Sequence, residues 1–196
     1  LQIDPARVTA GLLEHLNPGV KLLEGLNPTT LAKSRKSLAD AEHIRQAMEQ
    51  DGAALCEFFA WLDSALGRER ITELTIDERL TAAREQRPGY VSLSFNTIAA
   101  FNANGAMPHY HATRESHSVI EGDGLLLIDS GGQYLGGTTD ITRVVAVGTP
   151  NADQKVDFTL VLKGMIALSR AASPRGTPSP MRDAIARAPI WEGGAE

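Results

Sequence analysis

Cysteine is almost absent from this 196-residue sequence, which contains only Cys56. A single cysteine excludes an intrachain disulfide, and the apolar neighbours of Cys56 predict a buried thiol without a reactive role. No apolar run approaches the roughly 18 residues that span a bilayer, and no secretory signal is visible. We therefore expect no membrane partner and a cytoplasmic location. The net charge of −5 argues against nucleic acid as a partner, because nucleic-acid binding demands a basic face.

Hydrophobic residues make up 42% of the sequence, which is enough for a packed core. The clearest helix is predicted over residues 38–66, where apolar and aromatic residues recur at helical spacing and belong to the core rather than to a cofactor site. Gly52 interrupts this helix at a cost of about 1 kcal/mol relative to alanine. A second helix is predicted to begin at Thr75, where Thr75 and Glu78 match a capping box.

Two further helices are predicted in the last quarter of the sequence, over residues 152–172 and 179–188. The first of them carries an apolar stripe at helical spacing, which we expect to be buried: Phe158, Val161, Leu162, Met165 and Leu168.

The stretch that organises the chain is LLLIDSGGQYLGGTTDITRVVAVG, residues 125–148, in which Asp129 and Asp140 lie eleven positions apart. Both border apolar runs that read as strands, and a glycine-rich reversal separates them. Two carboxylates in apolar surroundings repel each other unless a divalent cation binds both. The alternative is a pair of strand-end carboxylates bonded to backbone amides. The hydroxyls of Thr138 and Thr139 are candidates to orient a carboxylate.

Two histidines, His109 and His111, fall on a strand expected over residues 106–111 and would share one face of it. Spacing alone leaves open whether such a histidine binds a metal, supports a ligand or contacts a substrate. Arg143 is interpreted as the partner of a structural ion pair.

The segment LLLIDSGGQYLGGTTDITRVVAVGTP resembles the first metal-ligand segment of aminopeptidase P, the Xaa-Pro aminopeptidase family of the pita-bread metallopeptidases. The resemblance extends upstream through NTIAAFNANGAMPHYHAT and downstream through VDFTLVLKGMIALSRAASPRGT, and its GTTD-x-TR form is closer to aminopeptidase P than to prolidase or methionine aminopeptidase. It implies an α+β fold, the first half of a pita-bread (creatinase/aminopeptidase-like) fold, with an antiparallel sheet and helices packed on its outer face. Residues 1–36 would be the tail of a preceding non-catalytic domain and a linker, and residues 37–196 an incomplete catalytic domain.

The resemblance also implies the site. In the family, two divalent ions are held by two aspartates, one histidine and two glutamates; Asp129 would chelate one ion and Asp140 would bridge both. His109 matches a histidine that contacts substrate and is not a metal ligand. Oxygen ligands with one imidazole suit manganese. The implied substrate is a peptide with proline at the second position, whose N-terminal residue is removed, and the full-length protein is expected to be a homodimer.

Three of the five implied ligands have no counterpart here. The family's histidine follows a tryptophan that matches Trp191, in a His-Gly-Thr-Gly-His segment, and the glutamates come later. Glu192 and Glu196 do not replace them, because they lie in the wrong place and on no strand-like run. We therefore expect a fragment or a truncated reading frame, since the sequence also begins at Leu1 rather than methionine. Such a chain is predicted to be inactive and to associate through an uncovered apolar face.

Two other functions remain open at this level. Some pita-bread proteins have lost metal ligands and serve as non-catalytic binding or chaperone modules. The other alternative is a prolidase-type dipeptidase.

Overall fold

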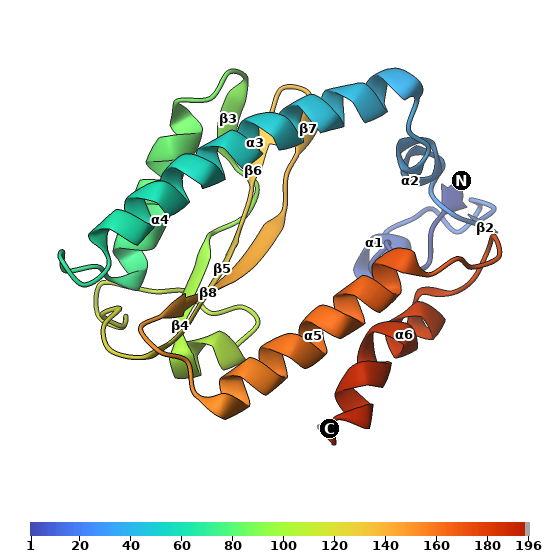
Figure 1. Ribbon diagram of the computed structural model, residues 1–196. Coiled ribbons are helices and arrows are strands. Elements are labelled where there is room, and N and C mark those ends of the chain that lie inside the picture. The colour runs from blue at the N-terminus through green and yellow to red at the C-terminus, as the bar shows by residue number, and fades with distance from the viewer. Residues whose placement is uncertain (195–196) are drawn as a thin grey trace.

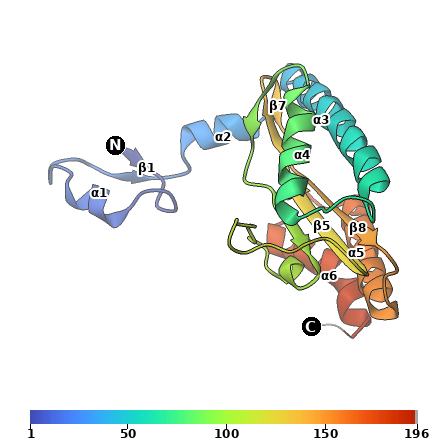
Figure 2. The ribbon, with the colours of Figure 1, turned by 90° about the vertical axis from the view of Figure 1, so that its left-hand side faces the viewer.

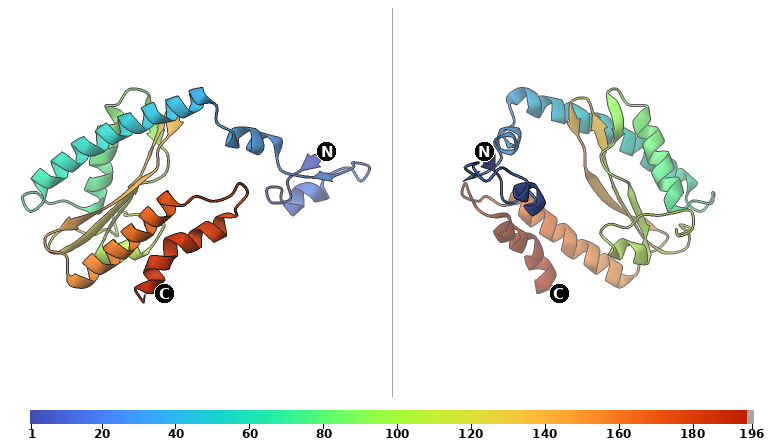
Figure 3. Two further views of the ribbon diagram at one scale, coloured as in Figure 1. Left: turned by 45° about the vertical axis from the view of Figure 1, so that its right-hand side comes forward. Right: turned by 180° about the vertical axis from the view of Figure 1, so that it is seen from behind.

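The computed structural model describes residues 1–194, which form an arm and a body. Residues 1–36 project away from the rest of the chain (Figures 2 and 3). The arm carries four short elements: β1 (Gln2–Ile3), α1 (Ala10–Glu14), β2 (Leu23–Glu24) and α2 (Pro28–Ser34). Within residues 1–36, Ile3 alone is buried. The arm therefore has almost no core of its own.

The outer layer of the body consists of α3 (Leu38–Ala65) and α4 (Glu73–Glu85) (Figure 1). The predicted start of α4 at Thr75 is wrong. Thr72 caps the helix, and the hydroxyl of Thr75 accepts a hydrogen bond from the backbone N of Thr72 at 3.2 Å. Thr75 thus takes the role of the glutamate in a capping box, one turn earlier than the sequence pattern suggested.

The central sheet is antiparallel and has the order β4 (Ile98–Phe101), β5 (Gly124–Ser130), β8 (Ile141–Val147). Burial alternates along β5, so that Leu126, Ile128 and Ser130 face the helices and the residues between them face the other way. A smaller sheet continues from it in the order β3 (Tyr90–Leu93), β6 (Gly132–Tyr134), β7 (Gly137–Thr138).

The core lies between these helices and the central sheet. Large apolar side chains that are at most 2% exposed meet there: Phe58, Leu62, Ile71, Ile76, Leu80, Leu126 and Ile128. Each such burial contributes about 1.5–3 kcal/mol. The prediction that Cys56 is buried is wrong, because its side chain lies off the stripe of α3 that faces the sheet and is exposed.

The last two helices, α5 (Ala152–Arg170) and α6 (Ser179–Glu192), form a hairpin beside the body (Figure 1). They approach closely at Gly164, where an added Cβ would lie 2.1 Å from the carbonyl oxygen of Ala186. The predicted burial of the α5 stripe is wrong: Val161 is 58% exposed and Met165 is 52% exposed. The helical spacing is correct. Among the described residues, α6 packs against α5, and sheet residues such as Leu125 and Val144 lie near Phe158, but the stripe stays largely exposed.

The segment after β4 is not the predicted strand. Asn102 has φ +50°, in the left-handed region, and starts a 3₁₀ helix, η1 (Asn102–Ala106). His109 and His111 follow in irregular chain and are both exposed. They therefore share no strand face.

Candidate metal centre

Asp129 and Asp140 are brought together by the β5–β8 hairpin. Asp129 lies directly opposite Thr142 in the ladder, and Asp140 precedes Thr142 by two residues. Because side chains two positions apart share a face, Asp129, Thr142 and Asp140 point away from the buried layer of helices. Asp129 is half-buried and Asp140 is exposed. The two carboxylates therefore lie on the open face of the sheet.

Thr142 lies at the candidate site and was not singled out from the sequence. Its Oγ1 donates a hydrogen bond to Asp129 Oδ1 at 2.7 Å, which fixes the orientation of that carboxylate. The hydroxyls expected in this role point elsewhere: Thr138 donates to Gln133 Oε1 at 2.9 Å, and Thr139 turns into the core. The position opposite Asp129 in the hairpin was the signal that could have identified Thr142.

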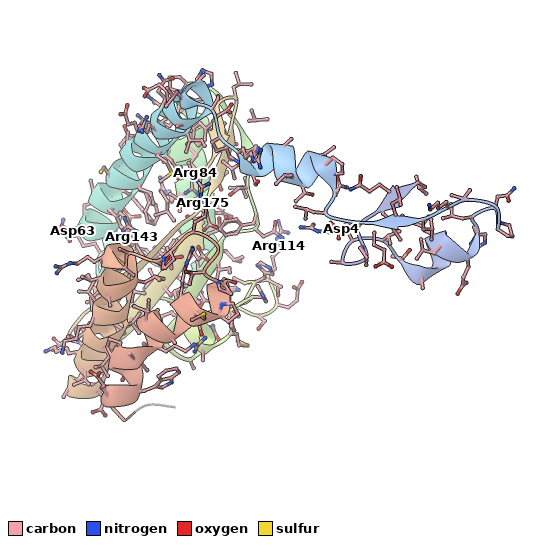
Figure 4. All side chains as sticks on the ribbon, turned by 90° about the vertical axis from the view of Figure 1, so that its right-hand side faces the viewer. Asp4, Asp63, Arg84, Arg114, Arg143 and Arg175 are labelled. Carbon is pink, nitrogen blue, oxygen red and sulfur yellow. The ribbon has the colours of Figure 1, made fainter. Side chains whose placement is uncertain are left out.

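A buried polar cluster lies on the opposite face of the same hairpin. Asp51 accepts hydrogen bonds from Arg84 Nε at 2.6 Å, Tyr134 Oη at 3.0 Å and Thr139 Oγ1 at 2.8 Å. Arg84 Nη2 donates in turn to Ser130 Oγ at 3.1 Å. Burial, and then the charge of Asp51, raise the pKa of Tyr134. Figure 4 shows Arg84 inside the body, between the long helix and the sheet. We call these five residues the Asp51 cluster.

The segment that carries His109 begins on the same face as Asp129. A Cβ on Gly105 of η1 would lie 3.9 Å from the Cβ of Leu127, the neighbour of Asp129 on that face. Tyr110, the next residue after His109, donates from its hydroxyl to Glu73 Oε2 at 2.7 Å. The base of this segment is therefore fixed, while the ring of His109 is exposed.

Arg143 does not form the predicted ion pair with any of the described residues. It is exposed, and its Nη1 donates to the backbone carbonyl of Thr142 at 2.7 Å. Figure 4 labels Arg143 beside α3 and the sheet. Arg143 lies opposite Ile128 in the ladder, on the face toward the helices, but it is exposed, and no carboxylate of residues 1–194 forms an ion pair with it.

The donor chemistry suits a divalent cation, but the ligand set is small. Carboxylate oxygens are the ligands that manganese and magnesium prefer, and Asp129 and Asp140 offer them on one accessible face. Across residues 1–194, no three side chains of histidine, cysteine, aspartate or glutamate converge into a metal site. Glu192 ends α6 and lies on no strand, and Glu196 lies outside the described residues. The two aspartates are therefore too few, by themselves, to make a metal site within residues 1–194.

The sequence of this chain is similar to those of aminopeptidases P. Aminopeptidase P1 of Lotus japonicus is 36% identical over 215 residues, which cover 98% of this chain and 32% of that protein. A protein of Talaromyces marneffei named "Probable Xaa-Pro aminopeptidase P" is 42% identical over 178 residues, covering 90% of this chain and 27% of that protein. The chain thus spans about a third of the length of the curated relatives it matches.

A solved structure has the same arrangement of helices and strands. The X-prolyl aminopeptidase of Caenorhabditis elegans, described as a cytosolic enzyme with a di-nuclear active site, matches with a TM-score of 0.82 and 33% identity over 88% of this chain and 28% of that chain. This match confirms the predicted α+β fold of pita-bread type, of which the chain forms one part. Residues 42–196 also match the model of metallopeptidase family M24. The chain belongs to metallopeptidase family M24.

Proposed function

We propose that this chain supplies one part of the catalytic centre of a Xaa-Pro aminopeptidase. Asp129 and Asp140 would be two of its metal ligands, and His109 would contact the peptide. The observation that carries the proposal is the shared face of the two aspartates, where a hairpin presents two carboxylates outside the core. The similarity to aminopeptidases P supports the choice of substrate, a peptide with proline at the second position.

Asp129 and Asp140 would supply part of a site for two divalent ions, and we propose manganese because the complete ligand set implied by the family, oxygen ligands with one imidazole, favours it. When bound, the ions would polarise the scissile carbonyl and lower the pKa of a water molecule. Thr142 would hold Asp129 in one orientation through its 2.7 Å hydrogen bond. His109, exposed on the segment anchored by Tyr110, would be free to meet the substrate.

The remaining ligands would come from sequence beyond this chain, so we propose that the 196-residue chain alone is inactive. Residues 1–36 would be the tail of a preceding domain, in keeping with the projecting arm, and residues 37–196 an incomplete catalytic domain. The full-length protein would be a cytoplasmic homodimer. Among residues 1–194, no helix combines the length and the apolar character that a membrane crossing requires.

The test uses the full-length protein encoded by the parent gene. We expect hydrolysis of a Xaa-Pro-Xaa tripeptide in the presence of Mn²⁺, and loss of that activity by at least about 100-fold in Asp129→Asn and Asp140→Asn, since each removes a charged ligand. The matched control is Asp63→Asn, the same change at an exposed aspartate of α3. We expect it to leave turnover unchanged.

Other results would point to other functions. Cleavage of Xaa-Pro dipeptides but not of tripeptides would identify a prolidase-type dipeptidase. A full-length protein without turnover, whose later histidine and glutamate ligands are substituted, would be a non-catalytic binding module. Turnover by the purified 196-residue chain would contradict the proposal that it is inactive.

A further inference from the structure

We propose that the Asp51 cluster is a positioning device, which sets the separation of Asp129 and Asp140 from the far side of the sheet. Two of its members are the immediate neighbours of these aspartates: Ser130 follows Asp129, and Thr139 precedes Asp140. The metal-binding role of the two aspartates rests on the proposed function. The effect of the cluster on their order is a separate claim, which can be measured without metal.

Thr139 is held at all of its polar atoms. Its Oγ1 donates to Asp51 Oδ2 at 2.8 Å and accepts from the backbone N of Gly132 at 2.8 Å. Its backbone N donates to the carbonyl of Gly132 at 2.9 Å, and its carbonyl accepts from Ser94 Oγ at 2.9 Å. A residue bonded in this way has little freedom, so the backbone that enters Asp140 is fixed.

The β5 strand of the hairpin, which carries Asp129, is bonded to the Asp51–Arg84 ion pair. Arg84 reaches Ser130 on β5 while it binds Asp51 on α3, so one guanidinium joins three elements. Next to Ser130, a Cβ on Gly131 would lie 2.0 Å from the carbonyl oxygen of Thr139. The two chain segments are therefore in close backbone contact at this point. This contact restricts how far the backbone beside Asp129 can move relative to the backbone beside Asp140.

An ion pair is an unusual way to fill this core. Apolar side chains of similar volume often stabilise a core as well as a buried ion pair does, or better. Arg84 and Asp51 are both fully buried, and Arg84 Nη1 is without a hydrogen-bond partner among the described residues. Charge and directional hydrogen bonds hold side chains in one geometry, which apolar packing does not do. Here they hold Ser130 and Thr139, the two residues beside the proposed ligands.

The first measurement is the backbone order of the metal-free 196-residue chain by ¹⁵N relaxation. Thr139→Val keeps the shape of the side chain and removes its hydroxyl. We expect the order parameters of the Asp129 and Asp140 amides to fall from about 0.85 to below about 0.6. Thr139→Ser, which retains the hydroxyl, should keep them high. Leu80→Ala is the control for general loss of stability, because Leu80 is a fully buried residue of the same core outside the cluster.

Unchanged order parameters in Thr139→Val, or an equal fall in Leu80→Ala, would overturn the proposal. If Thr139→Val does not fold, Tyr134→Phe removes one hydrogen bond to Asp51 and leaves the ring in place. We expect it to lower the order of the Asp140 amide more than that of exposed residues on α3. An effect no larger at Asp140 than on α3 would also overturn the proposal.

The second measurement is the Mn²⁺ affinity of the full-length protein encoded by the parent gene, followed by electron paramagnetic resonance. We expect binding to weaken by about 10–100-fold in Thr139→Val and to be retained in Thr139→Ser, since outer groups that orient ligands have effects of this size. If the unmutated full-length protein binds no Mn²⁺, the metal assignment fails. The order parameters still decide whether the cluster positions the two aspartates.

Discussion

The hydroxyl of Tyr110 donates a 2.7 Å hydrogen bond to Glu73 Oε2, and so joins the segment that carries His109 to the first turn of α4. Glu73 is completely buried. Its carboxylate also accepts from the backbone N of Phe101 and from the backbone N of Ser118, both at 2.7 Å. A buried carboxylate needs such donors, and these three come from the start, the middle and the end of the segment 101–118. Glu73 therefore determines how this loop closes over the edge of β4.

Replacing Glu73 by glutamine should loosen this loop. The amide of glutamine would present N–H groups to donors, and the charge-assisted hydrogen bonds, worth about 1.5–3 kcal/mol each, would be lost. We expect the free energy of unfolding to fall by about 2–4 kcal/mol. Urea denaturation followed by circular dichroism measures it.

The matched control is Glu78→Gln, the same change at an exposed position of the same helix. It should shift the free energy of unfolding by less than about 0.5 kcal/mol, as surface substitutions do. Equal effects at Glu73 and Glu78 would show that the buried hydrogen bonds contribute nothing.

Tyr110 should make stability depend on alkaline pH. Burial, and then the hydrogen bond to Glu73, raise its pKa to about 12, from an ordinary value of 10.0. Because the folded-state pKa lies above the unfolded one, the stabilisation is complete below pH 10 and is lost as the pH rises from 10 through about 12.

Absorbance of the phenolate at alkaline pH follows this titration. Tyr110→Phe should remove a late-titrating step and should flatten the decline of stability above pH 10. Because the pKa of Tyr134 is raised as well, the amplitude of the change decides: if it is no smaller in Tyr110→Phe than in the unmutated chain, Tyr110 does not contribute to the late step.

The exposed stripe of α5 should drive self-association of the isolated chain. Val161 is 58% exposed and Met165 is 52% exposed, one turn apart on the same helix face. We expect concentration-dependent association in sedimentation velocity, and a shift toward monomer when both are replaced by glutamate. Lys163→Glu, on the same helix and also exposed, changes the net charge by the same amount. It should leave the association largely unchanged, and an equal shift would assign the effect to charge repulsion.

The hairpin that carries the two aspartates could be predicted because its signals are local. Apolar runs, a glycine-rich reversal and the positions of Asp129 and Asp140 all lie within residues 125–148, and the observed β5 and β8 follow them. The face shared by the aspartates depends on register, which places Thr142 opposite Asp129. Register was not used in the sequence analysis, and Thr142 was therefore missed.

The Asp51 cluster and Glu73 could not be predicted in this way. Asp51 and Thr139 are separated by 88 positions, and the sequence around Asp51 reads as an ordinary polar position of a helix. Burial of a charged residue depends on which elements pack against it. The same limit explains the error on α5, where helical spacing identified an apolar stripe but not whether anything covers it.

Two glycines with opposite environments test the close contact beside Asp129. An alanine at Gly131 would place its Cβ 2.0 Å from the carbonyl oxygen of Thr139 and 2.3 Å from Ser94 Oγ. Backbone cannot move away as a flexible side chain can, so we expect Gly131→Ala to lower the free energy of unfolding by about 1–3 kcal/mol, as overpacking does. Broadening of the amide NMR resonances of Asp129 and Asp140 should accompany this loss of stability.

Gly52→Ala is the matched control, the same added methyl group in the middle of α3. No atom lies within 4 Å of its Cβ position, and alanine is the better helix former, so we expect a gain of about 0.5–1 kcal/mol. Urea denaturation of both variants at equal m-values compares them directly. Opposite signs would mean that the loss at Gly131 comes from its neighbours and not from the methyl group itself. A gain at both positions would mean that the two strands have room to separate, and the fixed spacing of Asp129 and Asp140 would then need another cause.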